Sequence, residues 1–338
     1  MSLARYTLRR LLSSVVTLIG ALCLVFLISR ALIPNPARAW AGPRADADTV
    51  RHIGERYHLY DPLYVQLFYY LADLARGDLG VSPNTGQPVL KMIYAYFPAT
   101  IELALVSMAI SLLIGILSGV ISASKKDGPV DHGIRVFALL GVASPPFLIA
   151  LLMQLVFFFW LGIIPDSGGR ISTGLAAPVH ITGLFFFDSL VTGNWVVFLN
   201  SLQHIALPAA AQALLYFGIA TRLTRASVLE VLGKDYVRMA RAKGLSRRMV
   251  MYKHALRNAL IPTATVMAVM FAYMLGGSVV IESIFQWPGL GRYAATALFS
   301  LDYPGVMGAT LTFALCVIVV NFVADLLLAV LDPRVQLG

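Results

Sequence analysis

The residue types that usually carry enzyme chemistry are sparse in this sequence, and they do not cluster. The six histidines are scattered with no pair at metal-ligand spacing, and Cys23 and Cys316 lie far apart. No Gly-x-x-x-x-Gly-Lys-Ser/Thr phosphate loop is present, so ATP binding by that route is not predicted. No nucleophile with a nearby base stands out, as a hydrolase would need. The sequence therefore predicts no catalytic residue and no metal or cofactor held by this chain.

The densest charge lies in residues 222–257, where basic and apolar side chains alternate. Residues 236–243 are mostly good helix formers, Gly244 suits the left-handed position after a helix, and Ser246 can cap a second helix that begins at Arg247. We expect two short helices joined by a sharp turn. Their apolar surface would consist of Met239, Ala240, Ala242, Leu245, Met249 and Tyr252. That surface suits a groove on another protein, although the residues equally fit a basic loop resting on anionic lipid headgroups.

The rest of the chain has the composition of a membrane protein. Of its 338 residues, 58% are apolar and only 13% are charged, and the mean hydropathy is +0.77. A soluble body of this size would need more polar surface. A hydrocarbon core about 30 Å thick takes roughly 20 helical residues to cross. We expect six spanning helices, in residues 10–30, 103–123, 136–165, 205–221, 258–281 and 303–324.

Some features of these runs leave two interpretations open. Pro145 and Pro146 remove two backbone donors from the third run and predict a kink, which could be a static bend or a pivot for gating. Glu102 and Asp325 lie near the ends of spans, where an acid must face water or a partner subunit, or line a path. The first run is longer than the apolar part of a signal peptide and lacks a clear cleavage site, so we expect it to remain as an anchor.

Charge is distributed unevenly between alternate loops. Basic residues concentrate in residues 1–10, 125–135 and 222–257, which six spans would place on one side. The positive-inside rule assigns that side, and both termini, to the cytoplasm. This asymmetry accounts for the pI of 9.7 without a nucleic-acid partner.

Two long segments are expected on the outer side. Residues 33–97 include a plausible amphipathic stretch at 62–74 and predict a small folded cap. Residues 164–202, which contain the short apolar run 178–187, are expected along the outer membrane interface. The predicted organisation is an N-terminal segment with the first helix (1–32), the cap (33–97) and a core with helices two to six (98–338), which includes the cytoplasmic loop 222–257.

Several motifs resemble one known family. The run from Asp235 to Leu245, followed by residues 254–259, strongly resembles the coupling loop of ATP-binding-cassette (ABC) importer permeases of the dipeptide, oligopeptide and nickel class. Further matches along the chain are Glu282 with Phe285, Trp287-Pro288-Gly289-Leu290-Gly291-Arg292, Asp302-Tyr303-Pro304 and Leu331-Asp332-Pro333-Arg334.

This resemblance implies an all-α integral membrane fold with six transmembrane helices of the type I ABC importer kind and an extracytoplasmic cap after the first helix. It implies a heterodimer with a second homologous permease, two ATP-binding subunits and an extracytoplasmic solute-binding protein, in a bacterial or archaeal cytoplasmic membrane. ATP and Mg would be bound by the partner ATPase subunits. The implied ATPase-coupling residues are Tyr236, Val237, Arg238, Met239, Ala240, Arg241, Ala242, Lys243, Gly244 and Leu245, and the implied outer-loop motif is Glu282, Trp287, Pro288, Gly289, Gly291 and Arg292.

The sequence also departs from the family pattern. Arg238-Met239-Ala240 stands where importers in general have Glu-Ala-Ala, and Arg257 stands where they have a proline; both changes resemble the peptide-class variant. After the first helix, Ile33-Pro34-Asn35-Pro36 replaces the usual Pro-Gly-Asp-Pro.

The expected function is that of a permease subunit forming half of a path for a short peptide or similar small solute, by alternating access. A secondary transporter or channel, or a membrane scaffold that moves no solute, are the alternatives. The family handles dipeptides, longer peptides, nickel chelates, glutathione, haem and some oligosaccharides, and no residue here selects among them.

Overall fold

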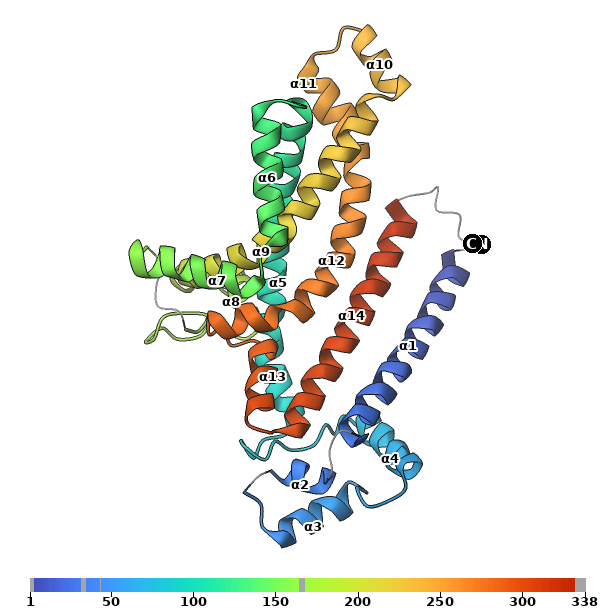
Figure 1. The fold of residues 1–338 in the computed structure, drawn as a ribbon, viewed down its shortest axis with the longest axis vertical. Helices are drawn as coiled ribbons and strands as arrows, with labels where there is room; N and C mark the ends of the chain where they lie inside the picture. Colours follow the sequence, from blue (N-terminus) through green and yellow to red (C-terminus); the bar gives the residue numbers. More distant parts are fainter. Residues whose placement is uncertain (1–2, 32–34, 43, 164–167, 332–338) are drawn as a thin grey trace.

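The computed structural model describes residues 3–31, 35–42, 44–163 and 168–331, and within them the regular secondary structure is helical apart from one isolated β-bridge. Five continuous helices are long and apolar enough to cross a membrane. They are α1 (Leu3–Ala31), α5 (Val89–Ser124), α9 (Trp195–Leu232), α12 (Leu256–Ile284) and α14 (Tyr303–Leu331), shown in Figure 1. Five of the six expected runs are thus confirmed as helices, each extending beyond its uncharged stretch; α5 begins at Val89, within residues expected in the cap.

The third expected run is not one helix. It consists of α6 (Pro129–Ala143), α7 (Pro146–Met153) and a π-helical turn, η1 (Gln154–Trp160), with a bend of 109° between the α6 and α7–η1 parts. Ser144 and Pro145 are extended, with ψ of 137° and 138°, because a residue that precedes proline is excluded from the helical region. The predicted kink is confirmed, and the expectation of a single tilted helix over 136–165 is wrong; residues 164 and 165 lie outside the described residues.

Small residues allow the helices around α9 to pack closely. A side chain at Gly115 or Gly119 of α5 would collide with Ala220 or Thr224 of α9. In the same way, a side chain at Gly218 of α9 would collide with the α6 backbone. Close approach through small residues is how membrane helices gain packing energy, because lipid supplies no hydrophobic force between them.

A buried ion pair fixes α6 against α9. Asp131 of α6 is fully buried and accepts hydrogen bonds from Arg225 Nε at 2.8 Å and Nη2 at 2.6 Å. The Ser122 hydroxyl and the Asp127 N–H, at 3.0 Å, bind the same carboxylate. Both oxygens of the Asp131 carboxylate therefore accept hydrogen bonds, which a buried charged group requires.

The expected cap folds as three short helices, α2 (Pro36–Ala41), α3 (Ala47–Arg56) and α4 (Leu63–Ala75), below the long helices in Figure 1. Trp40, Leu59 and Met307 of α14 form its core. The Asn35 side chain accepts a hydrogen bond from the Arg38 N–H at 3.0 Å, so it caps α2 as an aspartate could. The replacement of the family's aspartate by Asn35 therefore preserves the cap of α2. Ile33 and Pro34 lie outside the described residues.

The start of α14 is tied to the chain that leads from the cap. Asp302 accepts from Gly305 N–H at 2.9 Å, which caps α14, and from the Ser82 hydroxyl. At the other end of α14, Asp325 forms an ion pair with Arg10 of α1 at 3.1 Å. Asp325 thus contacts another helix of its own chain.

Candidate functional site

The charged loop forms a hairpin at one end of the molecule, beyond the ends of α6 and α14 (Figure 1). It consists of α10 (Asp235–Ala242), α11 (Arg247–Met249) and a π-helical turn, η2 (Val250–Ala255), which continues directly into α12. The expected pair of short helices is confirmed.

The turn of this hairpin follows from two residues. Gly244 has φ +77°, a conformation that costs a side-chain-bearing residue about 1–2 kcal/mol, and the space around its Cα is open. Ser246 caps the second helix, since its Oγ accepts from the Met249 N–H at 3.3 Å. Both predicted roles are confirmed.

The hairpin has one face turned inward and one exposed. Val237 and Ala240 of α10 are buried with Val250, and Val231 and Leu232 at the end of α9 pack against them. Because Val237 is completely buried, α10 is fixed to the end of α9.

The exposed face of the hairpin carries large apolar side chains. Met239 is 61% exposed, Tyr252 55%, Met249 45% and Tyr236 43%. Arg238, Arg241 and Lys243 are exposed around them. The predicted Met-bearing surface is therefore confirmed for Met239, Met249 and Tyr252, whereas Ala240 belongs to the inner face and Leu245 packs partly inward. The helical period explains this, since Ala240 lies three residues after Val237 on one face of α10.

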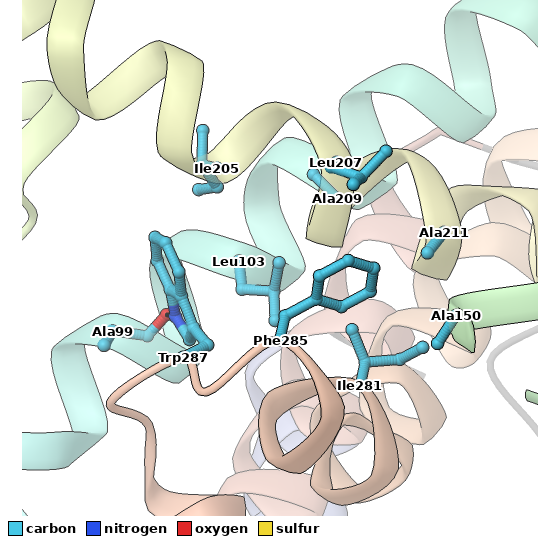
Figure 2. Packing of buried hydrophobic residues seen from close by; sticks show 10 residues of the cluster. All are labelled: Ala99, Leu103, Ala150, Ile205, Leu207, Ala209, Ala211, Ile281, Phe285 and Trp287. Atoms are coloured by element: carbon cyan, nitrogen blue, oxygen red, sulfur yellow. Dashed lines mark hydrogen bonds between the residues drawn. The ribbon is translucent and has the colours of Figure 1, made fainter. Parts of the chain in front are cut away.

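The outer-loop motif forms a buried turn between α12 and α13 (Leu290–Phe299). Trp287 is 1% exposed, and its Nε1 donates to the Ala99 carbonyl of α5 at 2.8 Å. Figure 2 shows this ring beside Ala99, with Phe285 and Ile281 directed towards α9 and Ala150 of α7. The turn predicted from Pro288 and the glycines is thus confirmed, and it packs where α5, α7, α9 and α12 meet.

Glu282 is the centre of this turn, although it lies inside α12 and is fully buried. Its carboxyl oxygens accept from Thr100 Oγ1 of α5 at 2.7 Å, Ser278 Oγ at 2.8 Å and the Arg292 N–H at 2.9 Å. A side chain at Gly289 would collide with this carboxyl group, which is why the motif has glycine there. Thr100 Oγ1 also accepts from the Leu290 N–H at 2.8 Å. One hydroxyl therefore connects α5, α12 and the start of α13.

Arg292 contacts Glu282 through its backbone and not through a salt bridge. The backbone N–H of Arg292 binds Glu282, whereas its guanidinium Nη1 donates to the Gln286 carbonyl at 2.6 Å. The first N–H groups of α13 have no partner within the helix and point at the Glu282 carboxyl group. Glu282 therefore binds the backbone of Arg292 and not its guanidinium group.

Glu102 of α5 holds the second outer segment. Arg170 donates to its Oε2 from Nε at 2.9 Å and from Nη2 at 2.5 Å, and both side chains are buried. The guanidinium also lies 3.7 Å from the centre of the Phe185 ring, at the start of α8 (Phe185–Val191). Burial lowers the pKa of Arg170, while the Glu102 carboxylate acts in the opposite direction. Glu102 is thus paired within the chain.

Asp188 stabilises the same outer segment. It accepts from the N–H groups of Ile181 at 3.2 Å, Thr182 at 3.0 Å and Gly183 at 2.9 Å. Burial alone would raise the pKa of this carboxyl group, but the hydrogen bonds from Thr182 and its neighbours lower it below the usual value. Residues 181–191 therefore form a compact fold around one carboxylate.

Comparison with known proteins matches this architecture. A family model described as "Binding-protein-dependent transport system inner membrane component" matches residues 112–337, and the N-terminal model of the same transport systems matches residues 3–104. The chain belongs to this permease family. It is a multi-pass membrane protein and a permease subunit of an ABC importer.

Similar proteins align with the permease over almost its whole length. A probable D,D-dipeptide transport system permease from Escherichia coli K12 is 41% identical over 96% of this chain and 95% of its own. A dipeptide transport system permease from Alkalihalophilus pseudofirmus is 38% identical over 98% and 99%, and a glutathione transport system permease from Escherichia coli K12 is 34% identical over 98% of both chains.

The structure also adds residues that sequence reasoning missed. Thr100 and Arg170 complete the sites of Glu282 and Glu102, and neither lies in a recognisable motif. Thr100 lies within the long apolar helix α5, where a threonine gives no specific signal. Within the described residues, no group of three or more His, Cys, Asp or Glu side chains could hold a metal.

Proposed function

We propose that this permease is one of two homologous membrane subunits of an importer for short peptides, driven by two ATP-binding partner subunits that hold ATP and Mg. An extracytoplasmic solute-binding protein would deliver the peptide, and both termini would lie in the cytoplasm of a bacterial or archaeal cell. The observation that carries this proposal is the exposed apolar face of the hairpin, where Met239 stands 61% exposed among basic side chains. The names of the relatives favour peptides as the solute class.

The hairpin is built to transmit a displacement. Val237 and Ala240 pack against Val250 of η2, and η2 runs without a break into α12. The 29 residues of α12 extend over about 43 Å, at 1.5 Å per residue, and end beside Glu282 and the Trp287 turn. A push on α10 by the ATPase would therefore move one helix whose far end is packed against α5, α7 and α9 at the outer side, and so favour opening to one side at a time.

Replacing Met239 by aspartate tests the docking role. We expect the Met239→Asp complex to lose its ATP-binding subunits on purification, or to lose ATP hydrolysis stimulated by binding protein and peptide in proteoliposomes. Met239→Leu, which keeps an apolar side chain, should retain both. If Met239→Asp hydrolyses ATP and imports peptide like the unchanged complex, the docking role of this surface is wrong.

Co-purification from native membranes separates this proposal from the alternatives. Recovery of a second permease and two phosphate-loop ATPases with the chain supports it. Recovery of the chain alone, with solute transport in liposomes without ATP, would favour a secondary transporter; recovery alone without any transport would favour a scaffold.

A further inference from the structure

A cavity of about 660 Å³ lies between α6 and α9, towards the hairpin end of the molecule. This volume falls within the range of ligand pockets, roughly 300–1,000 Å³. Its lining changes character along its length. Basic and polar side chains line one end, and Val136, Leu139 and Val142 line the other.

The basic end of the cavity carries more positive charge than the neighbouring carboxylates neutralise. The side chains of Arg135 and Arg222 form no hydrogen bond or ion pair with any residue that the structure describes, and both residues are exposed. Arg225 is held by the buried Asp131, and the Lys126 ammonium lies 3.9 Å from the Asp127 carboxylate. Unpaired guanidinium groups at the edge of a membrane span are costly unless an anion or water meets them.

The cavity as a whole, from its basic end to its apolar end, has about the length of one membrane leaflet. His132 and Val142 both line the cavity and lie ten positions apart on the same helical stretch, about 15 Å along its axis. A hydrocarbon core is about 30 Å thick, so this is half of it. Leu139 and Val142 are exposed along this wall, at 63% and 40%.

We propose that this cavity is a binding site for an anionic glycerophospholipid, with its phosphate between Arg135 and Arg222 and one acyl chain along Val136, Leu139 and Val142. Basic pockets between membrane helices bind anionic lipid headgroups in this manner. A free phosphate would satisfy the arginines but leave the apolar wall uncovered, so the two ends together specify a lipid. The Asp131–Arg225 pair pre-forms the site, because it fixes the spacing of α6 and α9. Placement in the cytoplasmic leaflet rests on the orientation of the proposed function, whereas lipid binding itself does not depend on transport.

The test is native mass spectrometry of the full chain in detergent, titrated with dioleoyl phosphatidylglycerol or dioleoyl phosphatidylcholine. We expect retention of the phosphatidylglycerol and little retention of the phosphatidylcholine. Arg135→Gln together with Arg222→Gln should weaken phosphatidylglycerol binding about 30-fold, from the usual contribution of two basic residues at an anionic lipid surface. The matched control, Arg248→Gln with Lys253→Gln, removes the same charge from the hairpin and should leave binding unchanged.

A second variant keeps the charge and fills the space. Ala226 lines the cavity and is exposed, so Ala226→Trp should block lipid entry while Ala226→Ser retains it. Competition with inorganic phosphate and glycerol phosphate separates the lipid from its headgroup. Displacement of the lipid by either competitor at similar concentration would make this an anion site and overturn the proposal. Equal binding of both lipids, or binding unaffected by the variants, would overturn it as well.

Discussion

Thr100 offers a sharp test of the outer turn, because one hydroxyl bonds two groups that come from different helices. It donates to Glu282 at 2.7 Å and accepts from the Leu290 N–H at 2.8 Å, and Thr100 is fully buried. Thr100→Val keeps nearly the same shape and removes only the hydroxyl. Thr100→Ser, the matched control, removes a methyl group and keeps both hydrogen bonds.

The expected loss follows from these two bonds. Removing the bond to Glu282 costs about 1 kcal/mol net, and leaving the buried Leu290 N–H without an acceptor costs roughly 1–3 kcal/mol more. We therefore expect Thr100→Val to lower the free energy of unfolding by about 2–4 kcal/mol. The methyl lost in Thr100→Ser should cost no more than about 1 kcal/mol.

The assay is unfolding of the purified permease in mixed micelles by titration with a denaturing detergent. It is followed by tryptophan fluorescence, since Trp287 donates a hydrogen bond to the carbonyl of Ala99, the residue before Thr100. A double-mutant cycle with Glu282→Gln gives the coupling between the two side chains. Hydrogen bonds between membrane helices average about 0.6 kcal/mol in such cycles, so a coupling above about 1 kcal/mol would single out this contact. If Thr100→Val is no less stable than Thr100→Ser, the hydroxyl does not hold the turn and the reasoning is refuted.

Three further predictions concern other parts of the chain. Gly244→Val should destabilise the hairpin by about 1–2 kcal/mol through its positive φ alone, seen as faster hydrogen exchange in α10, while Gly244→Asn should cost less; equal exchange in all three proteins would contradict the left-handed turn. Arg225→Met should lower the free energy of unfolding by roughly 3–5 kcal/mol, because Asp131 would stay buried without its partner. The double variant with Asp131→Asn should recover much of the loss, and a double variant as unstable as the single one would argue against the pair. The lowered pKa of Asp188 means that its contribution to stability is complete above pH 3.8 and is lost as the pH falls through its lower folded pKa. The hydrogen-exchange protection factors of residues 181–191, corrected for the intrinsic exchange rate at each pH, should therefore fall in acid, and Asp188→Asn should abolish that dependence.

Much of the fold could be predicted because lipid imposes a simple rule. Long uncharged runs must be helical in a bilayer, and five of the six expected runs are continuous helices. The hairpin was equally predictable, since Gly244 and Ser246 carry local signals that no distant residue modifies.

What sequence could not give are the contacts between distant segments. The Pro145-Pro146 pair indicated a kink, but the 109° bend depends on how α7 packs across α9 and α12. Glu102 and Arg170 are 68 positions apart, and no periodicity relates them. Thr100 and Glu282 are 182 positions apart, and their meeting depends on the depth of two helices in the bundle.

The break at Ser144 also has a consequence for how the protein fits its bilayer. α6 has 15 residues and is about 22 Å long, whereas α12 and α14 each have 29 residues and reach about 43 Å. Against a hydrocarbon core of about 30 Å, α6 alone is roughly 8 Å too short, so the lipid beside it must thin or α7 must sink into the acyl region. The stability of the permease should therefore depend on the acyl-chain length of the lipid and should rise in bilayers of shorter chains. A variant in which α6 is lengthened by two apolar turns should lose that dependence.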